Sequence, residues 1–255
     1  MKTLKVIGWH IGNNKFLSPA IIEQLYDVEV IVSESAANPK DGSFWNNEEP
    51  PGPLASYMTD NQHKLLELQY DELLAAGEID KIFDKYDNVA LMVFEGMPGI
   101  QDPGAELIEI AHARDDVRVI PIPGPDAAST AISVSGFFGL GHLFGGYCHG
   151  RQEIFNKLEL FKPLRGFPIV IYFRDIDYKD MVSSVIDVFG PQERMTVAVN
   201  LTRDDEIVLF GTAEELIDKK IFNHIDKDME RNKCAVVIEN PGTADEIARR
   251  KGIHA

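Results

Sequence analysis

The chain has 255 residues, of which 44% are hydrophobic and 26% are charged, a composition typical of folded globular proteins and not of disordered ones. Its formal net charge of −16 disfavours tight, autonomous binding of nucleic acid, because phosphate recognition usually needs a basic surface. The apolar runs are far shorter than the ~20 residues of a membrane-spanning helix. The first residues predict a strand and not a secretion signal. We therefore expect a cytoplasmic protein that makes no membrane contact.

Cys148 and Cys234 are the two cysteines of the chain. A disulfide framework is not expected from so few cysteines in a cytosolic chain of this size. Neither cysteine has a second Cys or a His at metal-ligand spacing, apart from the adjacent His149. We therefore expect no metal site.

The first half of the sequence alternates apolar strands with helices, which predicts an α/β fold. The expected strands are residues 4–7, 28–32, 88–94 and 117–120, and 88–94 is a continuous apolar run typical of a strand buried on both faces. The first helix is expected to start at the Ser18-Pro19 capping pair and to run to about residue 26. Further helices are expected over 65–83, interrupted at Gly77, and from the end of a Gly/Pro-rich turn to about residue 113. Residues 38–53, rich in Pro, Gly and Asn, predict a loop.

Three prolines within residues 121–125 form a stiff connector. We place a domain boundary here, with an N-terminal α/β domain over residues 1–122 and a C-terminal α/β domain over 123–255. The second half predicts helices near 126–134, over 179–189 and over 213–219, and strands over 169–173, 196–201, 206–210 and 234–238. Because two of these strands follow each other without a helix between them, the second sheet is expected to be mixed.

Two Gly/Pro-rich segments each follow a predicted strand and open a predicted helix: residues 95–104 and residues 121–129. Glycines let a ligand approach the main chain closely, and ligands of open α/β sheets bind beyond the carboxyl ends of the strands. Free N–H groups at a helix start add hydrogen-bond donors. Each segment alone is a weak signal, but together they predict a ligand site formed by main-chain atoms.

The pair GMPGIQDPG and VIPIPGPDA resembles the tetrapyrrole methylase superfamily, whose members use S-adenosylmethionine (SAM). The pattern is similar to that of the bacterial 16S rRNA ribose 2′-O-methyltransferase I branch, where the loops are GTPGISDPG and PIPGPSA. The resemblance extends over about residues 4–240. It implies a two-domain tetrapyrrole methylase fold, distinct from the Rossmann-type methyltransferases, with SAM in the interdomain cleft and usually a homodimer.

The same resemblance implies a set of cofactor-binding positions that act largely through the main chain. Carried onto this chain, the positions are Ile11, Glu95, Gly96, Met97, Gly99, Ile100, Asp126, Ala127, Phe173 and Leu201. Gly99 also shapes the first loop together with Asp102 and Pro103.

Two residues near the expected methyl donor are candidate catalytic groups. Glu34 follows a predicted strand end and could accept a proton from a hydroxyl, although a capping or solvated carboxylate explains it as well. His10 lies in the first loop and could serve as a base near neutral pH, or could be an ordinary loop histidine. Arg174, Asp175 and Asp177 stand where the branch has a YESPHR-like segment, so they line the substrate side or form an exposed turn.

The sequence leaves three functions open. The leading one is a SAM-dependent methyltransferase that acts on an RNA ribose, with RNA disfavoured by the net charge. The second is a small-molecule methylase of the corrin or siroheme kind, which needs positive charge for the carboxylates of the macrocycle; Arg151, Arg174 and Arg203 are the obvious contributors. The third is an inactive SAM-binding interaction module, because the chain has Val93-Phe94-Glu95 where the branch has Ser-Asp-Ala.

Overall fold

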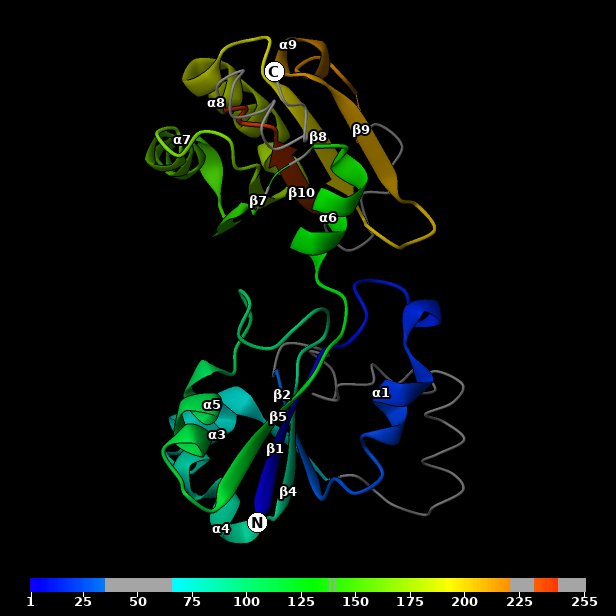
Figure 1. Ribbon diagram of the computed structural model, residues 1–255, viewed down its shortest axis with the longest axis vertical. Coiled ribbons are helices and arrows are strands. Elements are labelled where there is room, and N and C mark those ends of the chain that lie inside the picture. Colours follow the sequence, from blue (N-terminus) through cyan, green and yellow to red (C-terminus); the bar gives the residue numbers. More distant parts are fainter. Residues whose placement is uncertain (35–65, 138, 140, 221–231, 243–255) are drawn as a thin grey trace, which may run out of the picture. The chain divides into compact units, whose positions relative to one another are not determined.

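The computed structural model describes residues 1–34, 66–137, 139, 141–220 and 232–242. The chain forms two compact units, Met1–Asp126 and Ala127–Ala255, each with its own sheet and helices (Figure 1). The units divide on the C-terminal side of the proline-rich connector. The loop predicted over 38–53 lies outside the described residues. Among the helices that the structure describes, none has the length and hydropathy needed to cross a membrane.

The first unit is built on a five-stranded sheet with the strand order β3-β2-β4-β1-β5. All its neighbouring strands are parallel, as expected when strands alternate with helices. The strands are β1 (Lys2–Ile7), β2 (Val30–Ser33), β3 (Leu66–Gln69), β4 (Asn88–Met92) and β5 (Val117–Ile122). The helices and 3-10 turns are η1 (Asn14–Phe16), α1 (Pro19–Glu23), α3 (Tyr70–Ala75), η2 (Ile79–Lys81), α4 (Ile82–Lys85) and α5 (Ala105–His112).

Both faces of this sheet are covered (Figure 1), with α1 on one side and α3 and α5 on the other. Successive residues of β4 point to opposite faces: Val89 and Leu91 pack under α3 and α5, while Ala90 and Met92 pack under α1. Burial on both faces explains why residues 89–94 are apolar without alternation.

Two predictions for the first unit can be compared directly with the structure. The cap at Ser18 is confirmed, because its hydroxyl accepts a hydrogen bond from the Ala20 N–H and Pro19 opens α1. The helix predicted from residue 65 is wrong at its start, since Leu66–Gln69 is the edge strand β3. Its leucines suit a helix locally, but parallel pairing with β2 provides the hydrogen bonds that fix the extended conformation.

The carboxyl ends of the strands are aligned in register at one edge of the sheet. Ile7 of β1 is opposite Met92 of β4 and Ile122 of β5, and Ser33 of β2 is also opposite Met92. The loops that follow these residues therefore leave the sheet side by side, which positions the candidate site.

The second unit has a mixed sheet with the order β6-β7-β10-β8-β9, as the sequence predicted. The pair β6–β7 is parallel and the other pairs are antiparallel. The strands are β6 (Leu143–Tyr147), β7 (Ile169–Arg174), β8 (Arg194–Val199), β9 (Ile207–Thr212) and β10 (Lys233–Ile238). The helices are α6 (Ala127–Ser135), α7 (Gly150–Phe161), η3 (Asp175–Asp177), α8 (Tyr178–Phe189) and α9 (Ala213–Leu216).

The main core of the second unit lies between its sheet and α7, α8 and α9, and α6 packs on β7, β8 and β10. The helix α7 was not among the predicted elements. The side chain of its N-cap residue, His149, makes no capping hydrogen bond, and Ile154 and Leu158 are fully buried. Phe155 and Phe161 also pack on this core. The sequence therefore offers an apolar face but no capping residue at the helix start, and packing against α8 stabilises the helix.

Candidate cofactor site

The loops after β1 and β4 are joined by main-chain hydrogen bonds. The Trp9 N–H donates to the Gly96 carbonyl at 2.8 Å, and the Gly96 N–H donates to the His10 carbonyl at 3.0 Å. This reciprocal pair continues the β1–β4 pairing beyond the ends of the two strands. The first loop and the GMPGI turn therefore form one continuous main-chain surface.

The loop after β5 is packed against the same surface. The Gly8 N–H donates to the Ile122 carbonyl at 2.9 Å, and the Gly124 N–H donates to the Met97 sulfur at 3.4 Å. A Cβ atom added at Gly8 would lie 2.2 Å from the Met97 Sδ and 2.5 Å from the Gly124 nitrogen. The approach thus requires glycine, and it brings the two Gly/Pro-rich segments together.

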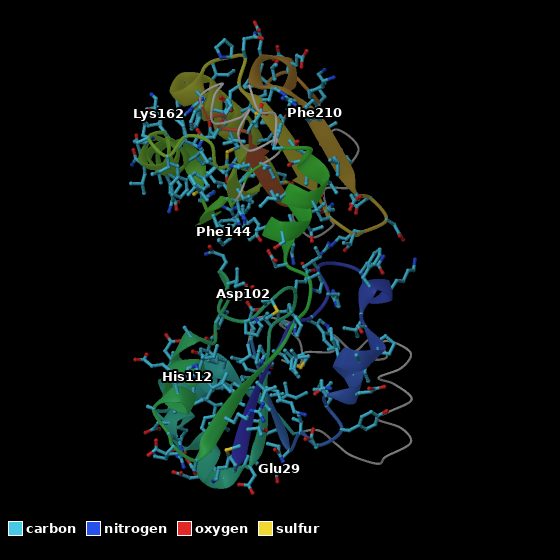
Figure 2. The ribbon with its side chains drawn as sticks, in the orientation of Figure 1. Glu29, Asp102, His112, Phe144, Lys162 and Phe210 are labelled. Carbon is cyan, nitrogen blue, oxygen red and sulfur yellow. The ribbon has the colours of Figure 1, made fainter. Side chains whose placement is uncertain are left out.

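The GMPGIQDPG loop is held by its own turns. Gly96, Gly99, Gln101 and Gly104 all have positive φ, a conformation that glycine adopts without steric cost. The Gly99 N–H donates to the Pro103 carbonyl at 3.3 Å, which closes the loop around Asp102. Figure 2 shows Asp102 on this loop and Glu29, which precedes β2, at the opposite end of the sheet.

The geometry of this edge fits a nucleoside cofactor held by main-chain atoms. A Cβ atom at Gly96 would meet no atom within 4 Å, so the main chain there has open space in front of it. Glu95 and Asp126, both partly buried, place carboxylates on two of the three converging loops. Carboxylates suit the positive charges of SAM, its sulfonium and its ammonium group.

The two candidate catalytic residues lie on loops at this carboxyl edge. Glu34 directly follows Ser33 at the end of β2 and is partly buried. The Nδ1 atom of His10 accepts a hydrogen bond from the Gly12 N–H at 3.2 Å, which places the ring proton on Nε2. In that tautomer Nε2 is a donor, so His10 would have to give up the Gly12 bond before Nδ1 could accept a proton.

The residues named from the sequence divide between the two units. The loops of the first unit carry Ile11, Glu34, Glu95, Gly96, Met97, Gly99, Ile100 and Asp126. Ala127, Phe173 and Leu201 belong to the second unit: Ala127 opens α6, Phe173 is 1% exposed in the core, and Leu201 follows β8. A contribution from Phe173 would therefore come from its main chain.

Gly8 and Gly124 are structural determinants of this edge that the sequence reasoning did not select. Gly8 directly follows the end of β1, and Gly124 is the centre of the Pro-Gly-Pro turn. A glycine placed right after a parallel strand is the available signal, but their mutual contact is visible only in the fold.

Comparison with known proteins agrees with this arrangement of sheet and loops. The chain belongs to the tetrapyrrole (corrin/porphyrin) methylases, whose family model matches residues 3–217. It is similar to proteins named ribosomal RNA small subunit methyltransferase I. The one from Bacillus subtilis is 28% identical over 94% of this chain and 75% of its own length. The one from Thermotoga maritima is 25% identical over 93% of this chain and 98% of its own.

Solved structures share the fold. A cobalt precorrin-4 methyltransferase superimposes with a TM-score of 0.59 at 17% identity, covering 92% of this chain and 94% of its own. A diphthine synthase gives 0.60 at 12% identity, covering 97% and 99%. The chain is a two-domain α/β protein of this fold and a SAM-dependent methyltransferase.

Proposed function

We propose that this methyltransferase acts on small-subunit ribosomal RNA and methylates a ribose 2′-hydroxyl. The observation that carries the proposal is the similarity, over more than nine-tenths of the chain, to relatives named ribosomal RNA small subunit methyltransferase I. The branch-like loops GMPGIQDPG and VIPIPGPDA support it.

The contribution of the chain to this reaction is mainly positioning. SAM supplies a methyl group that its sulfonium has already activated. The three joined loops would hold the cofactor through Gly96, Met97 and neighbouring main-chain atoms, with Glu95 and Asp126 near its positive charges. Fixing a donor and an acceptor in line can supply several kcal/mol towards the barrier.

The net charge of −16 makes the salt dependence of activity an informative measurement. An acidic chain that methylates RNA needs a local cationic contact, and its activity should then fall as salt rises. Two other results are open to the experiments below. The protein could methylate a corrin- or siroheme-type macrocycle, or it could bind SAM without transferring the methyl group.

The first experiment is a calorimetric titration with SAM and with S-adenosylhomocysteine, together with thermal melting. Micromolar binding should raise the melting temperature, and binding of neither molecule would remove the cofactor assignment. The second is transfer of labelled methyl groups to small-subunit rRNA from a strain lacking the corresponding methyltransferase, beside uroporphyrinogen. Labelled ribose supports the proposal, labelled macrocycle supports the small-molecule alternative, and cofactor binding without transfer supports the inactive module.

We also propose that the protein works in the cytoplasm, where ribosomal subunits are assembled, and that it does so as a homodimer. The resemblance to the superfamily supports the dimer. Sedimentation equilibrium tests it directly: twice the mass of one chain is expected, and one chain's mass at micromolar concentration would contradict it.

A further inference from the structure

The turn η1 places an exposed aromatic side chain beside a lysine. It lies in the loop between β1 and α1, at the carboxyl edge of the first sheet where the candidate cofactor loops meet. Phe16 is 63% exposed, and its neighbour Lys15 is exposed as well. The next residue, Leu17, packs against the core under α1. The chain therefore directs one apolar residue into the core and holds the residue before it in solvent.

Hydrogen bonds connect this turn to the cofactor loops. The His10 carbonyl accepts the Gly96 N–H at 3.0 Å, which fixes the first loop to the GMPGI turn. Three residues further on, the Asn13 side chain accepts the Lys15 N–H at 2.9 Å, and the Asn13 carbonyl accepts the Phe16 N–H at 3.1 Å. Lys15 and Phe16 are thus presented side by side on the loop that forms part of the candidate cofactor surface.

The charge of the first unit makes the position of Lys15 distinctive. Residues 1–126 contain nine Lys and Arg against 22 Asp and Glu, whereas residues 127–255 contain 16 against 19. The other described cations of the first unit lie within its strands or on the segments that lead into β4 and β5: Lys2, Lys5, Lys81, Lys85, Arg114 and Arg118. Among the described loops at the carboxyl edge, Lys15 is therefore the one cation. A phosphate group that approaches this edge would be attracted to that position.

An aromatic ring beside a cation is suited to single-stranded nucleic acid. An unpaired base stacks on the ring, and the cation neutralises a phosphate. A base inside a duplex is already stacked on both faces and offers neither of them to a side chain. Single exposed apolar residues are common on protein surfaces. Phe16 differs from them because it adjoins the one described cation of this edge, on a loop joined to the cofactor surface.

We propose that Phe16 and Lys15 bind the RNA acceptor: the Phe16 ring stacks on an unpaired base of small-subunit rRNA, and the Lys15 ammonium contacts a neighbouring phosphate. The inference rests on the proposed function, because it requires an RNA substrate. It adds that the methylated ribose lies near an unpaired base, in a loop of the rRNA and not within a regular helix. Both side chains act in binding and not in the chemical step, so their loss should raise KM and leave kcat unchanged.

The first test compares the full-length wild type with Phe16→Leu and Phe16→Trp in methyl transfer to small-subunit rRNA. Phe16→Leu keeps the apolar character but removes the ring, so KM should rise by about fivefold or more. Phe16→Trp retains a stacking ring and should keep the wild-type KM or lower it. Tyr26→Leu is the control, because it removes a 54% exposed ring from the segment that leads into β2, at the opposite edge of the sheet. S-adenosylhomocysteine binding should be the same in all four proteins.

The second test isolates Lys15 by its salt dependence. The Kd for small-subunit rRNA is measured with S-adenosylhomocysteine bound, at several salt concentrations. The slope of log Kd against log salt should be smaller by about 0.7 in Lys15→Gln, because one phosphate contact on a single strand contributes about that amount. Lys85→Gln removes an exposed cation at the opposite edge and should keep the wild-type slope.

An unchanged KM in Phe16→Leu, an equal rise in Tyr26→Leu, or an unchanged salt slope in Lys15→Gln would overturn the proposal. Loss of S-adenosylhomocysteine binding in Phe16→Leu would also overturn it, because Phe16 would then serve the cofactor or the fold. A wild type that methylates rRNA beside variants that match it refutes this inference alone. A wild type that binds S-adenosylhomocysteine but methylates no RNA refutes the proposed function, and the assignment of Phe16 and Lys15 falls with it.

Discussion

Gly124 lies so close to Gly8 that a Cβ atom on Gly124 would be 2.5 Å from the Gly8 carbonyl carbon. Two residues more than a hundred positions apart in the sequence are thus in main-chain contact at the carboxyl edge of the first sheet. The contact holds the connector that leaves β5 against the loop that leaves β1. The contact thereby fixes the spacing of the two loops at the candidate cofactor site.

Gly8→Ala should therefore separate the two loops. Its Cβ would clash with the Met97 sulfur and with the Gly124 main chain, and main-chain atoms cannot move aside as a flexible side chain can. We expect S-adenosylhomocysteine affinity to fall by at least about tenfold, or about 1.4 kcal/mol, in calorimetry. Gly141→Ala is the matched control, because its nearest atoms are 3.8 Å away. Unchanged affinity in Gly8→Ala would show that the contact is irrelevant to binding.

Lys5 is a buried cation in the central strand β1, 6% exposed. Its ammonium donates to the Gln24 carbonyl at 2.7 Å and to the Asp27 carboxylate. Asp27→Ala should destabilise the chain by about 1–3 kcal/mol, because a buried charge loses its counter-ion. Lys5→Met should lower the free energy of unfolding by less, because it removes the buried charge and with it the desolvation penalty of that charge. Urea unfolding measures both, and the reverse order would contradict the argument.

Glu193 is a buried carboxyl, 7% exposed, whose Oε1 accepts the Asn240 N–H at 2.7 Å. Burial raises its pKa above the ordinary value. The folded chain then binds more protons than the unfolded chain, so stability falls as pH rises from about 4.3 through the raised pKa. Glu193→Gln keeps the acceptor for Asn240 without the charge.

The Glu193→Gln chain should consequently be more stable than the wild type near neutral pH. The difference should shrink below about pH 4, where the wild-type carboxyl is protonated in both states. Urea unfolding at the two pH values measures it. A difference that stays constant with pH would mean that Glu193 does not titrate across this window.

Thr212 and Glu215 form a capping box at the start of α9. The Thr212 hydroxyl accepts the Glu215 N–H at 3.3 Å, and the Glu215 carboxylate accepts the Thr212 N–H at 2.9 Å. Thr212→Ala should cost about 1 kcal/mol of stability. The double variant with Glu215→Ala should lose less than the sum of the single losses, because both bonds belong to one motif. Strict additivity in urea unfolding would show that the two bonds act independently.

The sequence was informative where one local rule decided the outcome. The continuous apolar run at 88–94 predicted a strand buried on both faces, and Ser18 followed by Pro19 predicted the start of α1, because capping depends on adjacent residues. The loop motifs GMPGIQDPG and VIPIPGPDA resemble those of the methylase family, and such a resemblance depends only on the order of residues in the chain.

Tertiary structure decided what depends on residues far apart in sequence. Leu66–Gln69 became a strand because β2 offered a hydrogen-bonding edge, and α7 is stabilised by packing its apolar face against α8 and the core. The Gly8–Gly124 contact arises where separate strands end at one edge of a sheet. Sequence patterns report short-range preferences, whereas such contacts depend on strand order and register, which are set by packing of the whole unit.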